Sequence, residues 1–149
     1  MFARRFALAS FAVVALAAAG CSNMPGMSSE KKPAAGGEMT VPLSGKNEVP
    51  PNTSTAVGTA RVWLDGMTLK WTVTYSGTTG PVTAGHFHGP AAAGANAGVA
   101  LPFTGPMTSP IEGSATLTQA QVDQVKAGLW YVNLHTAAHP GGELRGQVK

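Results

Sequence analysis

The sequence is poor in cysteine and in charge, and both shortages narrow what the protein can be. Its 149 residues contain one cysteine, and charged side chains make up 11% of them. A lone cysteine excludes an intrachain disulfide. Ten side chains are basic and seven acidic, but Arg4 and Arg5 belong to the first twenty residues. Without those two, eight basic side chains balance seven acidic ones, which argues against nucleic acid as a partner.

The longest apolar run lies at the N-terminus and is too short for a permanent membrane span. It follows Arg4 and Arg5, carries no charge over residues 6–19 and ends in small residues before Cys21. A spanning helix needs about 20 apolar residues, whereas a basic start, a short apolar stretch and small residues are typical of a secretory signal peptide. We expect residues 1–20 to be that signal peptide.

Ala18-Ala19-Gly20-Cys21 resembles a lipobox, in which the cysteine thiol takes a diacylglycerol and becomes the mature N-terminus. The alternative is cleavage after an Ala-x-Ala triplet, which leaves a free thiol. We expect lipidation of Cys21, because the only cysteine stands where a lipobox needs it. The membrane is then a partner through the lipid anchor. Ser22 gives no inner-membrane retention signal of the aspartate kind, so we expect the outer membrane of the cell envelope, facing the periplasm or the cell surface.

The mature chain divides into two parts of different composition. Residues 21–39 are polar, rich in proline, glycine and serine, and without an apolar period, as in a flexible lipidated tether. From residue 40 to 149 the apolar period is two, which predicts one β domain. Strands are expected at 40–46, 56–64, 67–76, 81–88, 98–103, 112–117, 129–136 and 143–148.

A hairpin is the clearest local pattern, because Asp65-Gly66 is the dipeptide that a two-residue turn prefers. The turn predicts an inner face that pairs Leu64 with Met67, Val62 with Leu69, Ala60 with Trp71 and Gly58 with Val73. Trp63 falls on the opposite face, which meets water.

A single helix is expected before the penultimate strand. Thr118 and Gln121 form a capping box, Val122 and Val125 lie on one side, and Gly128 closes the helix. Eight short strands and one helix in about 110 residues predict an all-β antiparallel Greek-key sandwich or barrel, of the immunoglobulin or superoxide-dismutase kind.

All four histidines lie in two short clusters, His86 with His88 and His135 with His139. In a strand, positions 86 and 88 project to one face about 7 Å apart, as for two ligands of one metal ion. His135 ends a strand, and His139 follows in a turn closed by proline and glycine. With no thiolate available, zinc or copper is the natural ion. The alternative is a cluster of hydrogen-bonded histidines that only holds loops in place.

Glu143 and Arg145 share a face just beyond the second cluster. The simpler interpretation is a surface ion pair that contributes little. The functional alternative is that these residues support a metal site, in that Glu143 orients a histidine or Arg145 attracts an anion. The glycine- and alanine-rich stretch 89–98 is expected to be a flexible loop without a phosphate-binding pattern.

Five stretches, in order along the folded part, resemble the CHRD domain, a family named for a repeat in chordin. They are Leu43-Ser-Gly-Lys-Asn-Glu-Val-Pro-Pro51, Gly85-His-Phe-His-Gly-Pro90, Leu117-Thr-Gln-Ala-Gln121, Tyr131-Val-Asn-Leu-His-Thr136 and Pro140-Gly-Gly-Glu-Leu-Arg-Gly-Gln147. The resemblance implies an extracytoplasmic β-sandwich and no established enzymatic activity. Departures from the usual pattern are Phe87 and Leu144, where an aliphatic residue and isoleucine are usual.

Three functions remain open at this stage. The first is a non-enzymatic, membrane-anchored binding domain that holds copper or zinc through His86, His88, His135 and His139. The second is a structural or adhesive module of the cell envelope without a metal. The third is a superoxide-dismutase-like oxidoreductase, which needs a carboxylate ligand and a bridging imidazole that the sequence does not indicate. No protein partner or oligomeric state follows from the residues.

Overall fold

A computed structural model describes residues 37–149 of the chain. The expected signal peptide, the lipidation of Cys21 and nearly all of the expected tether lie outside the described residues. The elements are β1 (Glu38–Ser44), the 3-10 helix η1 (Gly45–Asn47), β2 (Val57–Asp65), β3 (Thr68–Ser76), β4 (Val82–His88), β5 (Val99–Pro102), β6 (Ile111–Thr116), α1 (Gln119–Lys126), β7 (Trp130–Thr136) and β8 (Leu144–Val148). No helix of this part is long and apolar enough to span a membrane.

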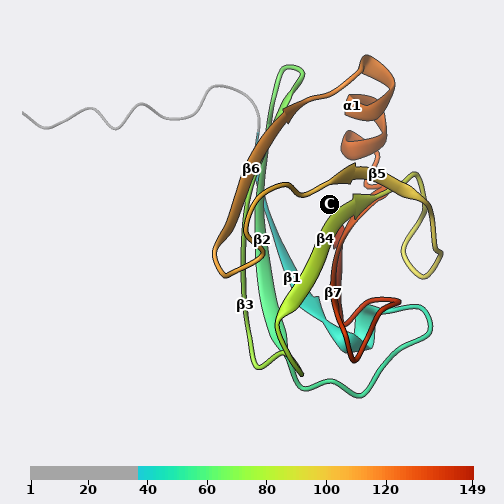
Figure 1. The fold of residues 1–149 in the computed structure, drawn as a ribbon. Coiled ribbons are helices and arrows are strands. Elements are labelled where there is room, and N and C mark those ends of the chain that lie inside the picture. The colour runs from blue at the N-terminus through green and yellow to red at the C-terminus, as the bar shows by residue number, and fades with distance from the viewer. Residues whose placement is uncertain (1–36) are drawn as a thin grey trace, which may run out of the picture. The chain divides into compact units, whose positions relative to one another are not determined.

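The eight strands form one antiparallel sheet in the order β5-β4-β7-β8-β1-β2-β3-β6. The sheet curls, so that β4 and β7 lie across from β2 and β3 with the core between them (Figure 1). The prediction of an all-β antiparallel fold with one helix before the penultimate strand is confirmed. Both layers of the sandwich belong to one sheet, joined where β8 pairs with β1.

The β2–β3 hairpin has the predicted faces but not the predicted register. Asp65 pairs with Thr68, so Gly66 and Met67 are the two loop residues. Gly66 has φ +57, a conformation that glycine adopts without strain. The prediction placed Gly66 second in the turn, and every partner was therefore wrong by two residues. Because side chains alternate with period two, the shift leaves each remaining strand residue on its expected face.

The core lies between the two halves of the curled sheet. Trp71 of β3 has its ring centroid 5.3 Å from that of Phe87 on β4 and 5.2 Å from that of Phe103, which follows β5. The predicted inner face is buried: Ala60, Val62, Leu64, Leu69, Trp71 and Val73 are at most 7% exposed. Met67 is 45% exposed, because it lies in the turn, and Gly58 is half-buried. Full burial of each large side chain contributes about 1.5–3 kcal/mol of hydrophobic stabilisation.

Helix α1 begins and ends as predicted. The Thr118 hydroxyl accepts a hydrogen bond from the Gln121 amide, and the Gln121 side chain accepts one from the Thr118 amide. Val122 and Val125 face the core, and Gly128 follows the helix with φ +70. The helix crosses from β6 to β7 over one end of the sandwich (Figure 1).

Both faces of β7 are buried, and this decides where a site can form. Trp130, Val132 and Leu134 face the core as expected. Tyr131 and Asn133 face outward yet are each 3% exposed, because other segments lie over them. The segment 89–98 bonds to Tyr131 through Ala97, and Asn133 donates to Glu48 of the segment after η1. The outer face of β4, β7 and β8 is therefore covered by loops.

Candidate metal centre

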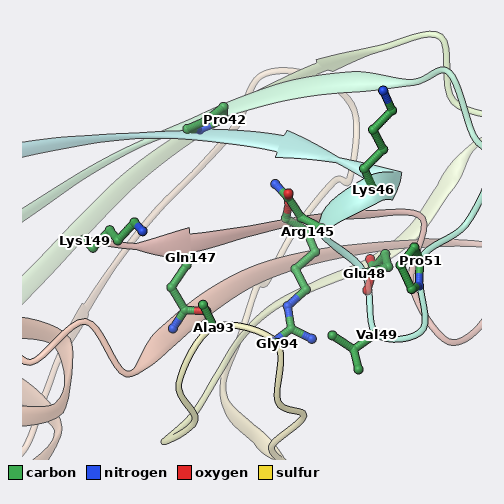
Figure 2. Close-up of a pocket in the computed structure, with 11 residues that line it drawn as sticks. Pro42, Lys46, Glu48, Val49, Pro51, Ala93, Gly94, Arg145, Gln147 and Lys149 are labelled. Atoms are coloured by element: carbon green, nitrogen blue, oxygen red, sulfur yellow. The ribbon is translucent and has the colours of Figure 1, made fainter.

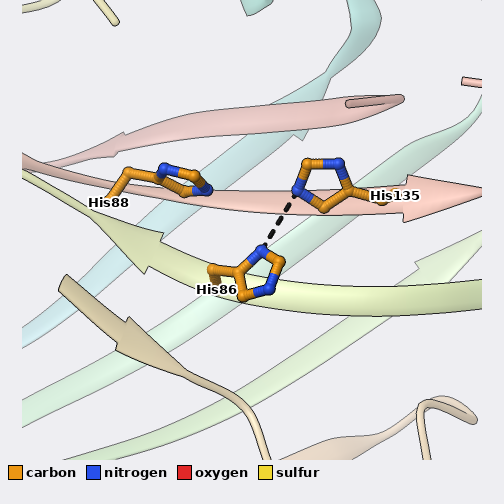
Figure 3. A group of neighbouring side chains, drawn as sticks. All are labelled: His86, His88 and His135. Atoms are coloured by element: carbon orange, nitrogen blue, oxygen red, sulfur yellow. Dashed lines mark hydrogen bonds between the residues drawn. The ribbon is translucent and has the colours of Figure 1, made fainter. Parts of the chain in front are cut away.

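Three of the four histidines come together on the outer face of two neighbouring strands (Figure 3). His86 and His88 project from the outward face of β4, while Phe87 between them is fully buried in the core. His135 projects from β7, where it lies opposite Ala84 in an antiparallel pair. This register places His135 beside His86, so one histidine of the second predicted cluster meets the first cluster.

Their ring nitrogens converge closely enough for one ion. His86 Nδ1 lies 3.2 Å from His135 Nε2, and one nitrogen of each ring lies within 4.8 Å of the others. Zinc–nitrogen bonds of about 2.0–2.1 Å in a tetrahedral site require nitrogens about 3.3 Å apart. His86 and His135 already meet that spacing across their hydrogen bond, and a His88 nitrogen lies within 4.8 Å of both. Within residues 37–149, this is the one group of three or more such side chains that meets these distances.

Backbone carbonyls fix the tautomers of two rings. His135 Nδ1 lies 3.0 Å from the Pro140 carbonyl oxygen, and His88 Nδ1 lies 3.0 Å from that of Ala97. A carbonyl oxygen only accepts, so both Nδ1 atoms carry hydrogen and both Nε2 atoms keep a lone pair. His88 Nε2 is buried without a hydrogen-bond partner. Histidine ligands typically hold their second nitrogen in this way, and the orphaned Nε2 fits a metal ligand.

The electrostatics of the cluster favour neutral imidazoles. Burial lowers the pKa of His86 below 6.5, and repulsion from His135 and His88 lowers it further. Burial also lowers the pKa of His135, although its hydrogen bond to the Pro140 carbonyl opposes the change. Metal ligation requires the neutral ring, so these shifts favour the form that binds an ion.

The structure does not bring His139 into the group. The turn after β7 is closed by backbone hydrogen bonds, from the His139 amide to the Thr136 carbonyl and from the Gly142 amide to the His139 carbonyl. The group that converges consists of His86, His88 and His135.

The expected surface ion pair of Glu143 and Arg145 is wrong, because both residues are buried. Glu143 is 0% and Arg145 2% exposed, and within the described chain the one ion pair joins Arg61 to Glu38 instead. The loops that cover the outer face of the sheet enclose both side chains. Neither residue makes a hydrogen bond to a histidine of the group.

Glu143 is enclosed by hydrogen-bond donors. Its Oε1 accepts from Ser54 Oγ at 2.7 Å and from the Thr79 amide at 2.9 Å. Its Oε2 accepts from Thr79 Oγ1 at 2.9 Å and from Thr136 Oγ1 at 2.6 Å. Burial alone raises the pKa of Glu143, but these bonds outweigh it and hold the pKa below 4.5. The carboxylate thus joins three chain segments at one end of the fold.

Arg145 holds the segment 89–98 against the sheet. Its guanidinium donates to Asn96 Oδ1 at 2.7 Å and to the Ala95 carbonyl at 2.5 Å. It also lies 3.5 Å from the ring centroid of Tyr131. The side chain of Asn96 donates in turn to the Val49 carbonyl at 2.9 Å. The expectation of a flexible loop at 89–98 therefore missed these hydrogen bonds.

Sequence reasoning also missed Glu48, which lies beside a cavity of about 560 Å³ (Figure 2). Burial raises the pKa of Glu48 to about 7, against the hydrogen bond from Asn133 and the charge of Arg145. Lys46, Arg145 and Gln147 also line the cavity. The alternation of β8 does indicate that its polar residues Arg145 and Gln147 face outward. No local sequence pattern indicates that loops, including the one that carries Glu48, cover that face.

The geometry defines an all-β domain with a histidine group on one covered face. A family model described as the CHRD domain matches residues 39–148. The chain belongs to this family, as the resemblance of its five sequence stretches implied. No curated protein and no solved structure matches the chain.

Proposed function

We propose that this protein is a lipid-anchored domain of the cell envelope that binds one copper or zinc ion through His86, His88 and His135. One observation carries the proposal: three imidazole nitrogens from two strands converge within 4.8 Å, and one of them is buried with no partner. A buried nitrogen without a hydrogen bond loses about 1–3 kcal/mol, which a metal–nitrogen bond would offset.

The donor set supports copper or zinc over harder ions. Neutral imidazole suits zinc and copper, whereas magnesium and calcium prefer oxygen ligands. Two of the three rings already donate their second nitrogen to a carbonyl, as ligating histidines do. A three-histidine site leaves a coordination position for water or for a ligand from a partner. The anchor and the envelope location rest on Cys21 and on the apolar run before it.

Metal analysis and titration test this function directly. The protein is expressed from the full-length sequence, purified without a histidine tag, and titrated with Zn²⁺ and with Cu²⁺ under a competing chelator. We expect about one tightly bound ion per chain, as three converging histidines allow. His88→Ala should remove most of the affinity.

His139→Ala is the matched control, because it removes an imidazole of the same chain from outside the group. Its affinity should equal that of the wild type. Equal losses in the two variants would refute the metal site. So would binding by the wild type no stronger than that of a variant in which His86, His88 and His135 are all replaced by alanine. The second outcome would favour the structural or adhesive module.

A further inference from the structure

His88 is one layer of a three-layer stack. Its imidazole is parallel to the ring of Tyr131, with centroids 5.0 Å apart and planes 5° apart. The guanidinium of Arg145 lies 3.5 Å from the Tyr131 ring centroid. His88, Tyr131 and Arg145 come from β4, β7 and β8, three adjacent strands of the sheet. We call this arrangement the His88 stack.

The same three side chains hold one segment, residues 89–98. His88 Nδ1 donates to the Ala97 carbonyl, and the Tyr131 hydroxyl accepts from the Ala97 amide at 3.1 Å. Arg145 donates to Asn96 and to the Ala95 carbonyl. The carbonyl that fixes the tautomer of His88 is therefore itself held in place by Tyr131, while Arg145 holds the two residues before it.

The burial of the Arg145 charge has a free-energy cost that packing alone does not explain. A guanidinium that is 2% exposed is costly, because burying a charge costs several kcal/mol; among residues 37–149 it has the charge of Glu48 nearby but forms no direct ion pair. A methionine or leucine would fill the space without that cost. The guanidinium instead offers a planar face to Tyr131 and a fork of donors to the segment 89–98, which an apolar side chain cannot do.

We propose that Tyr131 and Arg145 are positioning residues of the metal site and that they act through His88. Tyr131 sets the plane of the imidazole by stacking, and Arg145 holds Tyr131 and the segment 89–98 from the other side. Together they keep Nδ1 on the Ala97 carbonyl and Nε2 directed to His86 and His135. This proposal rests on the proposed function, because it concerns the geometry of the same ligand.

A double-mutant cycle tests it in the full-length protein. Tyr131→Leu removes the stacked ring, and removal of such supporting groups typically weakens metal binding about 10- to 100-fold. If Tyr131 acts through His88, the same change in the His88→Ala background should alter the affinity for Cu²⁺ by less than about threefold. Tyr131→Phe keeps the stacked ring but loses the hydroxyl that holds Ala97, so its loss of affinity should be smaller than that of Tyr131→Leu.

Electron paramagnetic resonance of the copper-loaded protein separates positioning from general stability. The wild type should show coupling to three nitrogens, and Tyr131→Leu to two, since the His88 ligand is released. Arg145→Met provides a second variant in case Tyr131→Leu does not fold. It should weaken Cu²⁺ binding about tenfold, again only when His88 is present.

The outcomes separate the two proposals. If the wild type binds no ion, both fail. If it binds through three nitrogens but Tyr131→Leu and Arg145→Met keep that affinity and spectrum, only the positioning role is overturned. Equal losses with and without His88 also overturn it, because the two residues would then act on the fold as a whole.

Discussion

Replacing Glu143 with glutamine removes one charge from the most enclosed carboxylate of the domain. The NH2 group of the new glutamine cannot take the place of Oε1, because there it would face the backbone N–H of Thr79, and two donors cannot bond to each other. At Oε2 it faces the hydroxyls of Thr79 and Thr136, which rotate to accept. All four hydrogen bonds can therefore still form, but none of them is any longer to a charged group. Bonds to a charged group contribute about 1.5–3 kcal/mol and neutral ones about 0.5–1.5. Because a neutral amide costs less to bury than a carboxylate, part of the difference over four bonds is offset, and we expect a net loss of about 2–3 kcal/mol.

Urea unfolding at several pH values measures this effect. The pKa of Glu143 is lowered in the fold, so the unfolded state takes up the proton first as the pH falls. The stabilisation is fully present above 4.5 and disappears as the pH falls through the lowered pKa. The difference between the wild type and Glu143→Gln should thus shrink in acid. Glu112→Gln, at an exposed glutamate of β6, is the matched control. Equal stability of the two variants at pH 7 would refute the reasoning, as would a difference that persists in acid.

Three further predictions concern the core, the metal site and the anchor. Trp71→Ala should lower the free energy of unfolding by about 3–5 kcal/mol. Trp63→Ala, which loses a cation–π contact with a surface arginine, should lower the free energy of unfolding by about 1 kcal/mol or less. Equal losses in the two variants would contradict the assignment of Trp71 to the buried face and Trp63 to the exposed one. Zn²⁺ affinity should hold to below pH 6.5 and then fall, because the pKa values of His86 and His135 are lowered; an affinity that is unchanged at pH 4 would exclude histidine ligands. Cys21→Ser should abolish acylation, and membrane fractionation like that of the wild type would disprove the lipid anchor.

Local patterns predicted the elements of this fold well. Period-two alternation located the eight strands and their faces, and the capping box of Thr118 and Gln121 located the helix. The hairpin register was missed because Asp65-Gly66 fits a two-residue turn in two ways. The two turns differ in whether Leu64 pairs with Met67 or with Leu69, and in the structure it pairs with Leu69, which is also in the core.

The histidine group could be predicted from the sequence, whereas the burial of the residues around it could not. Two histidines two apart in a strand must share a face, and His135 was expected as the third ligand because a strand end holds it more rigidly than a loop would. That β4 and β7 are neighbours, with His135 opposite Ala84, was known only from the structure. Glu143 and Arg145 were misplaced because outward-facing charged residues usually meet water. Whether a loop covers them depends on contacts such as Ser54 with Glu143, which are 89 residues apart and leave no trace in local sequence.

The position of β8 in the sheet has a consequence for how the domain folds. This strand follows the other seven along the chain, yet it lies in the middle of the sheet, between β7 and β1. The two halves have no continuous hydrogen-bonded connection until Leu144–Val148 is available. Contacts between distant parts of a chain form late and slowly. A chain that lacks β8 should therefore keep the two halves of its sheet apart, and the sandwich can close only when this strand pairs with both of its neighbours.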